Sequence, residues 1–409
     1  MTEQSETKLM EETVEKADRK FAKRLTPTTF KALRIVESFI SDNKLVCYGG
    51  MAINNILPKK AQFYGRREFP DYDFFSNDAL NDAKKLANIY YKNGFENVEA
   101  KSGVHEGTYK VYVNFFNIAD ITQLDLGFFT NIQKKSLKKR NILYAPPDFL
   151  RMSLYLEFSR PKGDTSRWEK LLPRLNLLNQ YYPIKIKSCQ LKDSEKLTNT
   201  EVEIYDKIKN KLIHENVIFF GGFADTQYHK YTRSKKSKSK LACVDVLSED
   251  AKKTVESIEK DISEYNPRID HIKTIGELIP EHYTITINNR IYSFIFQTEA
   301  CYTYNRLKIK NKTINIATIF TMMSLYLTFI YNDDKNYNHD RILCTAEMLN
   351  SIYLKNRGSQ KGILRNYTVN CMGEQETLED ILSRKSEIYK NIKKGDTKYD
   401  RYFLKYEPK

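Results

Sequence analysis

The chain has 409 residues, 41% of them hydrophobic, and a formal net charge of +15 at pH 7. This length predicts two domains, and the hydrophobic content is sufficient for globular packing, which argues against a disordered protein. The positive charge favours a polyanionic partner, most commonly nucleic acid, although a lysine-rich composition could produce it without any such partner.

Residues 1–45 predict a helical extension. Residues 1–24 are charged and lack the apolar core of a secretory signal. The next segment, TPTTFKALRIVESFI, predicts a helix with Thr26 or Thr28 as its N-cap and Pro27 in its first turn. Because no run of about 18 apolar residues occurs anywhere in the chain, we expect no transmembrane helix.

The cysteines give little sign of a metal or disulfide framework. Six cysteines and six histidines are scattered along the chain, and no two cysteines form a CxxC pair. We therefore expect neither a zinc site nor a disulfide framework, and a reducing compartment fits this pattern best.

Two long segments of the chain resemble each other. The stretch LVCYGGMA (45–52) aligns with VIFFGGFA (217–224). The distance along the chain between these two stretches is nearly the same for a second pair, in which FLRMSLYLEF (149–158) aligns with FTMMSLYLTF (320–329). An ordered series of matches at a nearly constant offset predicts two copies of one fold.

Both copies predict the same order of elements. A short strand runs into Gly-Gly and a helix, then come an acidic strand, a helix, paired strands and two helices. We expect a catalytic domain at 46–187, a degenerate copy at 200–353 and a C-terminal helical extension at 354–409. The predicted fold class is α+β, with two tandem mixed sheets and helices packed against them.

The first copy contains closely spaced carboxylates in DYDFFS. In a strand, Asp71 and Asp73 would point to the same face, and a divalent cation would remove their mutual repulsion. Their oxygens suit magnesium or manganese. Asp120, in the apolar run FFNIADIT, is the candidate for a third ligand, because an unpaired Asp in a buried strand would be costly. Asp125 is the alternative, and a structural, hydrogen-bonded role for Asp120 stays open.

The Gly-Gly pair precedes a predicted helix. Gly49 and Gly50 allow the backbone to approach a phosphate closely, and the helix that starts near Met51 adds free amides and a favourable dipole. A Gly-Gly pair alone is as often a simple turn, so this prediction depends on the neighbouring carboxylates.

The second copy serves as an internal control for these carboxylates. Cys243 replaces Asp71, Asp120 falls near Glu299 or a neighbour, and only Asp245 keeps its aspartate. If the carboxylates were structural, both copies would need them. Their loss from one copy favours a metal site in the other.

A basic cluster is also lost from the second copy. The cations of SRPKGDTSRWEK in the first copy meet uncharged or acidic residues in the second. They are candidates to neutralise a triphosphate, although a solvated loop would have the same composition. These residues are Arg160, Lys162 and Arg167.

The motifs together resemble those of the DNA polymerase β-like nucleotidyltransferase superfamily: a strand, Gly-Gly, Asp-x-Asp and a distant Asp. The insert between Gly50 and Asp71 is longer than usual for that superfamily, and it contains Lys59, Lys60, Arg66 and Arg67. Over residues 20–380 the chain is similar to the poly(A) polymerase catalytic subunits of large cytoplasmic DNA viruses, of the mimivirus and megavirus type and more distantly of the poxvirus type.

This resemblance implies a template-independent poly(A) polymerase that transfers AMP from ATP to RNA 3′ ends. It implies two Mg²⁺ or Mn²⁺ ions, held by Asp71, Asp73 and Asp120. Alternatives are a CCA-adding enzyme, a uridylyltransferase, a small-molecule nucleotidyltransferase or a non-catalytic RNA-binding factor. The expected location is the host cytoplasm, in a viral factory, or the virion. The expected assembly is a homodimer or a complex with a viral processivity partner.

Three basic stretches are candidates for RNA contact, although charge runs are usually solvated surface. They lie at 134–140, 233–240 and 306–312. The candidate residues are Lys134, Lys135, Lys138, Lys139, Arg140, Arg233, Lys235, Lys236, Lys238, Lys240, Lys308 and Lys310.

Overall fold

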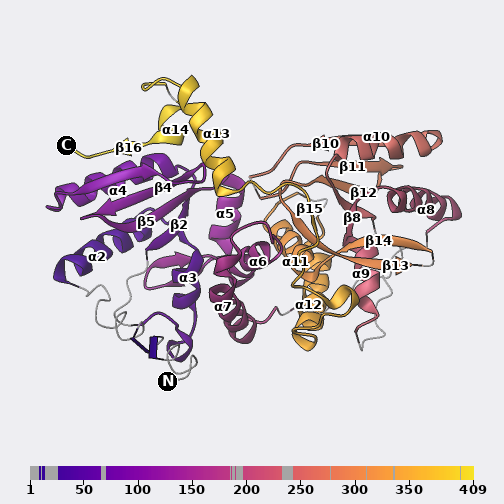
Figure 1. Cartoon of the computed structure of the whole chain (residues 1–409), viewed down its shortest axis with the longest axis horizontal. Helices are drawn as coiled ribbons and strands as arrows, with labels where there is room; N and C mark the ends of the chain where they lie inside the picture. Colours follow the sequence, from indigo (N-terminus) through magenta and orange to yellow (C-terminus); the bar gives the residue numbers. More distant parts are fainter. Residues whose placement is uncertain are drawn as a thin grey trace. The chain divides into compact units, whose positions relative to one another are not determined.

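The chain folds into two compact units, each with its own sheet (Figure 1). The structure is a computed structural model that describes residues 9–10, 12–13, 26–65, 71–184, 186, 189, 197–232, 243–276, 278–309, 311–334, 337–396 and 398–409. Unit 1 comprises Met1–Leu124, Gln133–Ala145 and Lys385–Lys409. Unit 2 comprises Asp125–Ile132 and Pro146–Arg384.

Unit 1 contains the helix predicted near the start of the chain, α2 (Pro27–Asp42). The side chain of Thr26 caps it by accepting a hydrogen bond from the amide of Thr29 at 3.1 Å, and Pro27 occupies the first turn. This confirms the helix and selects Thr26 over Thr28 as its cap. The buried face of α2 consists of Ala32, Val36, Phe39 and Ile40.

The sheet of unit 1 has eight strands in the order β16-β3-β4-β5-β2-β1-β7-β6. The sheet is mixed, because β2 pairs with β5 and β1 pairs with β7 in parallel, while the other pairs are antiparallel. The strands are β1 (Val46–Cys47), β2 (Tyr72–Ser76), β3 (Val98–Ser102), β4 (Thr108–Val113), β5 (Phe116–Gln123), β6 (Leu137–Lys139), β7 (Ile142–Tyr144) and β16 (Lys405–Tyr406).

The two faces of this sheet differ in polarity. In β4 the buried Tyr109, Val111 and Val113 alternate with Lys110 and other partly exposed residues. Helix α4 (Ala79–Lys92) packs on the apolar face, where it contacts β3, β4 and β5. The opposite face therefore carries the polar side chains of the strands.

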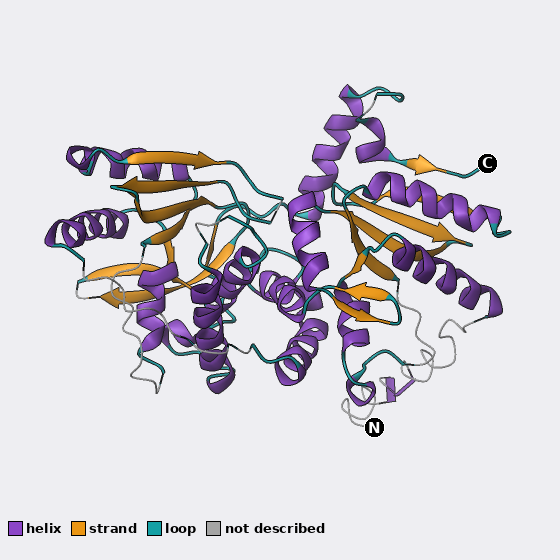
Figure 2. Ribbon diagram, turned by 180° about the vertical axis from the view of Figure 1, so that it is seen from behind, coloured by secondary structure: helices purple, strands orange, loops and turns teal. Residues whose placement is uncertain are grey.

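The sheet of unit 2 repeats this topology, with the order β10-β11-β12-β9-β8-β14-β13-β15. The first seven strands in this order, from β10 to β13, correspond one to one with β3-β4-β5-β2-β1-β7-β6 of unit 1, so the predicted duplication and the α+β class are confirmed. Figure 2 shows helices and strands in both parts of the chain. The strands are β8 (Ile218–Phe220), β9 (Asp245–Ser248), β10 (Arg268–Ile272), β11 (His282–Ile287), β12 (Arg290–Gln297), β13 (Tyr302–Ile309), β14 (Lys312–Ala317) and β15 (Cys371–Met372).

Equivalent helices of the two copies pack against each other inside unit 2. Helix α6 (Pro147–Phe158) lies against α11 (Ile319–Phe329), with the ring of Phe320 5.5 Å from Tyr155 and 5.6 Å from Phe158. The other helices are α3 (Gly49–Ile56), α5 (Leu126–Lys135), α7 (Trp168–Tyr181), α8 (Asn199–His214), α9 (Gly221–His229), α10 (Ala251–Asp261), α12 (His339–Lys355), α13 (Leu378–Asn391) and α14 (Tyr399–Phe403).

The C-terminal region differs from the helical extension that we expected. Besides α13 and α14 it contains two short strands, and β15 pairs with β13 while β16 pairs with β3. A strand of two residues is too short to show the alternation of apolar and polar residues that predicts a strand from sequence. These two strands therefore could not be predicted, because they form through tertiary contacts.

The expectation for the cysteines was wrong at one pair. Cys301 and Cys371 form a disulfide across 70 residues of sequence, which brings β15 beside the start of β13. Two cysteines so far apart in sequence carry no pairing signal of their own.

Candidate active site

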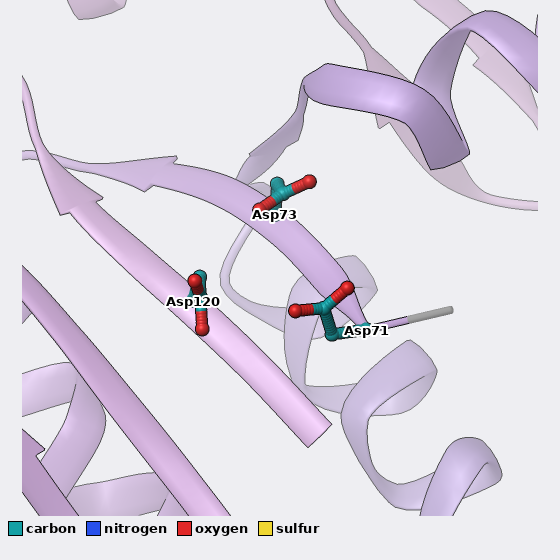
Figure 3. Close-up of side chains that lie close together, drawn as sticks. All are labelled: Asp71, Asp73 and Asp120. Atoms are coloured by element: carbon teal, nitrogen blue, oxygen red, sulfur yellow. The ribbon is translucent and has the colours of Figure 1, made fainter. Parts of the chain in front are cut away.

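The structure brings the three predicted carboxylates together on the polar face of the unit 1 sheet (Figure 3). Asp71 immediately precedes β2, Asp73 lies within it, and Asp120 lies on β5 directly opposite Asp73 in the parallel register. One potential ligand oxygen from each of the three lies within 4.8 Å of the others. All three side chains are partly exposed, so the group is accessible to solvent and to a ligand.

Gly49 brings the start of α3 against this group. Its φ is +68°, and the amide of the preceding Tyr48 donates a hydrogen bond to the backbone carbonyl of Asp73 at 2.9 Å. The helix begins at Gly49, slightly before the predicted start near Met51. The amino end of α3, including Gly50, is therefore adjacent to the carboxylates.

Two further residues belong to the group and were missed by sequence reasoning. The side-chain amide of Asn117 donates to Asp71 at 2.8 Å and to Asp120 at 2.7 Å. Lys110, opposite Asp120 on β4, forms an ion pair with it. Burial would lower the pKa of Lys110, but its hydrogen bond to Asp120 and the carboxylate charge outweigh burial and raise that pKa.

The neighbouring side chains of Cys47 and Tyr48 are neutral. The hydroxyl of Tyr48 lies 2.8 Å from that of Thr122, and its ring stacks on Phe75 with centroids 4.0 Å apart. Burial, assisted by the charge of Asp73, raises the pKa of both Cys47 and Tyr48. Neither group ionises at neutral pH, so the negative charge of the site comes from the aspartates.

The chemistry of the donor set fits divalent cations. Three carboxylates offer the oxygen ligands that Mg²⁺ and Mn²⁺ prefer. The side-chain Oδ1 of Asn117 is buried and has no hydrogen-bond partner, so one more acceptor oxygen is present beside the carboxylates. Within the described residues, no other group of three acidic, histidine or cysteine ligands comes this close together.

The equivalent position in unit 2 has lost this donor set. Asp245 occupies the place of Asp73, and Cys243 precedes it at the place of Asp71. The register of β12 with β9 pairs Ile295 with Val246, which places Phe294 opposite Asp245. Our expectation that Asp120 corresponds to Glu299 was wrong, because the offset between the copies changes at this strand.

Aromatic packing fills the equivalent place in unit 2. Phe294 stacks with Phe296 and Tyr337, with centroid distances of 6.2 and 5.8 Å. The amide of Phe294 donates to Asp245 at 3.3 Å. Burial raises the pKa of Asp245 to about 7, although the positive charge of Arg341 partly offsets this effect. The remaining aspartate thus lies beside aromatic packing and is only partly exposed.

The predicted triphosphate-binding cations lie in unit 2. Arg160 lies over the ring of Tyr302, 5.4 Å from its centroid, and Arg167 forms an ion pair with Glu157 at 3.2 Å. Lys162 is exposed. Their role in nucleotide binding stays a prediction.

The alternative third carboxylate, Asp125, has a structural role. It is exposed in unit 2 and accepts hydrogen bonds from the amides of Gly127 at 2.8 Å and Phe128 at 3.3 Å, at the start of α5. Asp120, and not Asp125, joins the acidic group.

The predicted RNA-contacting residues are mostly exposed or partly exposed where they are described. Lys139 donates to the carbonyls of Asn55 and Ile56 at 3.0 and 2.6 Å, and so stabilises the end of α3. The other described candidates are Lys134, Lys135, Lys138, Arg140 and Lys308. The following candidates lie outside the described residues: Arg233, Lys235, Lys236, Lys238, Lys240 and Lys310.

No helix among the described residues combines the length and apolar character that a membrane span needs.

Comparison with known proteins points to one family. Residues 34–164 match the family described as poly(A) polymerase catalytic subunit. A protein of African swine fever virus assigned as such a subunit is 36% identical over 162 residues, which cover 38% of this chain and 34% of that relative. The corresponding protein of Acanthamoeba polyphaga mimivirus is 29% identical over 240 residues, or 55% of this chain and 40% of the relative.

The fold comparison extends over nearly the whole chain. The crystal structure of the Megavirus polyadenylate synthase superposes with a TM-score of 0.82 and 20% sequence identity, covering 99% of this chain and 85% of that protein. The two proteins share a fold. The sequence matches, by contrast, span only about a third to two fifths of the viral relatives.

Proposed function

We propose that this chain, whose residues 34–164 match the poly(A) polymerase catalytic subunit family, is a template-independent poly(A) polymerase that adds AMP from ATP to the 3′ end of RNA. The observation that carries this proposal is the acidic group of Asp71, Asp73 and Asp120. It lies in the copy that contains most of the matched residues 34–164, and the second copy keeps only Asp245 of the three.

The site would hold two Mg²⁺ or Mn²⁺ ions. Asp71 and Asp73 would bind both ions, and Asp120 would bind one of them. Bound ions would supply neutralising charge for the phosphates and a lowered pKa for the attacking 3′-hydroxyl. The fit of the donor set to such ions supports this assignment.

The protein's own residues contribute alignment. The backbone amides at Gly49, Gly50 and Met51, at the amino end of α3, would hold the triphosphate while the 3′-hydroxyl attacks the α-phosphorus and pyrophosphate leaves. Asn117 and Lys110 fix the orientation of the carboxylates before substrate arrives. Little covalent chemistry is required of the side chains, so positioning and charge provide the rate.

We further propose that RNA is held by charge and by base stacking, with no base-edge recognition. The net charge of +15 supports a long polyanionic substrate over a small one. We expect the chain to work as a homodimer or with a viral processivity partner. Because the similar proteins come from viruses, we place the protein in the host cytoplasm or in the virion.

The nearest alternative is another transferase with the same acidic group, such as a CCA-adding enzyme or a uridylyltransferase. The decisive assay offers each of the four labelled nucleoside triphosphates to an RNA primer with Mg²⁺ or Mn²⁺. Incorporation of ATP alone is expected, and preferential incorporation of UTP or CTP would replace the proposal by its alternative.

The Asp71→Ala variant tests the assignment of the site. RNA extension should be abolished while the circular dichroism spectrum and the thermal unfolding curve stay those of the parent chain. A variant that still extends RNA would show that catalysis takes place elsewhere. Titration of the free Mn²⁺ signal by electron paramagnetic resonance gives a second readout, because the variant should also bind Mn²⁺ more weakly.

A further inference from the structure

A row of charged residues crosses the unit 1 sheet. In the strand register, Lys405 of β16 lies opposite Lys101 of β3, and Lys101 lies opposite Lys110 of β4. Lys110 in turn lies opposite Asp120, which lies opposite Asp73. Three lysines on adjacent strands therefore lead directly to the acidic group.

The row lies on the polar face of the sheet. Lys405 alternates with Tyr406, whose hydroxyl donates to Asn88 of α4 on the apolar face at 2.8 Å. Residues opposite each other in register point to the same face, so Lys405, Lys101 and Lys110 share the face of the aspartates. Their side chains are 71%, 47% and 30% exposed, respectively, so accessibility increases away from the acidic group.

We propose that the two outer lysines of this row, Lys101 and Lys405, bind successive phosphates of the RNA strand whose 3′ end reaches the acidic group, while Lys110 stays paired with Asp120. The inference rests on the proposed function and adds the path of its substrate. Adjacent strands are about 4.8 Å apart, so flexible lysine side chains on consecutive strands can each meet a phosphate of an extended strand.

The position of Gly49 indicates which substrate uses the row. Gly49, at the amino end of α3, approaches Asp73, whereas the lysines continue from Asp120 across β4, β3 and β16. If the triphosphate occupies the amides at the start of α3, the row is on the other side of the aspartates. That side is then available to the strand that supplies the 3′-hydroxyl.

Neighbouring side chains are consistent with a nucleic-acid surface. The Nζ atom of Lys101 lies 5.5 Å from the ring centroid of Tyr112, so an aromatic face lies beside the cation. Glu99 forms an ion pair with Lys101 at 2.5 Å, and Glu407 forms one with Lys405 at 3.8 Å. These carboxylates compete with phosphate and would lower the affinity of the free row.

The test compares two double variants in RNA binding. Lys101→Ala/Lys405→Ala removes the two outer lysines and leaves Lys110 in place. Lys85→Ala/Lys92→Ala removes the same charge from α4, on the apolar face of the sheet, and is the matched control. The probe is a short fluorescent oligoadenylate that ends in a 3′-deoxy nucleotide, titrated by anisotropy at several salt concentrations.

We expect the row variant to bind the probe several-fold more weakly and to lose about 1.4 from the slope of log affinity against log salt, at about 0.7 for each lost contact to a single strand. The control should change neither. In the extension assay, the KM for RNA should rise and the KM for ATP should stay unchanged. Glu99→Gln should strengthen probe binding, because it frees Lys101 from its carboxylate.

Two results would overturn the proposal. The first is an unchanged salt slope in the row variant, or an equal loss in the control. The second is a raised KM for ATP with unchanged RNA binding, which would assign the row to the triphosphate. Failure of the proposed function is distinguishable, since the unaltered chain would then not extend RNA with ATP, while the difference in probe binding between the row variant and its control would still be measured.

Discussion

A Cβ atom added at Gly49 would lie 2.4 Å from Oδ2 of Asp73, so the helix and the carboxylate are neighbours only because residue 49 has no side chain. The same relationship occurs between Gly221 and Asp245, where the distance would be 2.0 Å. Both glycines have positive φ, +68° and +69°. The duplication has thus kept this contact in a site that lost its other carboxylates.

Gly49→Ala should displace Asp73 and lower RNA extension by about 100-fold, since small misplacements at a reacting centre have effects of that size. Mn²⁺ binding, followed by electron paramagnetic resonance, should weaken as well. Gly221→Ala is the matched control, with the same steric conflict in unit 2. It should lower the unfolding temperature but leave Mn²⁺ affinity per folded molecule unchanged. Equal losses of metal binding in both variants would contradict a specific role for Gly49.

Asn117→Ala should weaken Mn²⁺ binding by about tenfold, at the lower end of the range for residues that orient metal ligands. The amide holds Asp71 and Asp120 in one arrangement, and without it these carboxylates are free to separate. Asn81→Ala, at an exposed asparagine that donates to Asp78 beside α4, is the control. Unchanged Mn²⁺ affinity in the Asn117 variant would limit that residue to a structural role.

Asp245→Asn should make the chain more stable near pH 8, by about 1–3 kcal/mol, and should flatten its stability between pH 4 and 7. Burial raises the pKa of this carboxyl to about 7 in the folded state, against an ordinary value of 3.8. Between these values the folded state binds the proton and the unfolded state does not. The stability of the unaltered chain therefore falls as pH rises through this window and is constant above it.

Urea unfolding at pH 5 and pH 8 measures this difference. RNA extension by Asp245→Asn should equal that of the unaltered chain, in contrast to Asp73→Asn, which should be inactive. A destabilised Asp245→Asn variant at pH 8 would show that the ionised carboxylate is needed at this position.

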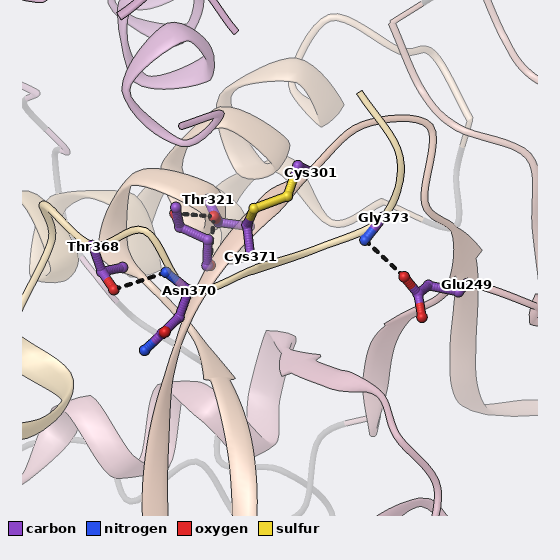
Figure 4. Close-up of a disulfide and its surroundings, with 8 residues drawn as sticks. Glu249, Cys301, Thr321, Thr368, Asn370, Cys371 and Gly373 are labelled. Atoms are coloured by element: carbon purple, nitrogen blue, oxygen red, sulfur yellow. Dashed lines mark hydrogen bonds between the residues drawn. A yellow bond between two sulfur atoms is a disulfide. The ribbon is translucent and has the colours of Figure 1, made fainter. Parts of the chain in front are cut away.

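Reduction of the disulfide between Cys301 and Cys371 should destabilise unit 2 by up to about 4 kcal/mol, the loop-entropy value for a link across 70 residues. The bond links Cys371 to Cys301, and two residues further along the chain the amide of Gly373 donates to Glu249 at 3.1 Å (Figure 4). Urea unfolding with and without a phosphine reductant measures the effect. Cys301→Ser/Cys371→Ser should match the reduced chain and be insensitive to reductant, and a reductant effect that persists in this variant would exclude the bond as its cause.

Local motifs predicted much of the candidate site. Asp71 and Asp73 lie two residues apart, just before and within β2, and Gly49 closely follows β1, so residue spacing alone was enough to single them out. Asp120 was found because an aspartate in an apolar run needs a partner. The two sheets followed from the repeated order of elements, which both copies preserve.

Contacts across strands could not be predicted from spacing. Lys110 and Asn117 join the site through the register of β4 with β5, which includes a bulge between Val111 and Tyr112. The structural equivalence of Asp120 in the first copy and Phe294 in the second was missed for a related reason. The sequence offset between the two copies changes at this strand, and only the strand pairing reveals that change. The Cys301–Cys371 bond likewise depends on the return of the chain after α12.

The lysine row ends on β16, a strand that follows all of unit 2 in the sequence. β16 completes the edge of a sheet whose first strand is β1, and unit 1 is assembled from Met1–Leu124, Gln133–Ala145 and Lys385–Lys409. A ribosome must therefore synthesise all of unit 2 before the unit 1 sheet can gain its edge strand β16. No uninterrupted stretch of the chain holds the whole of unit 1 without unit 2 as well, so co-translational folding cannot complete unit 1 before unit 2 has been synthesised.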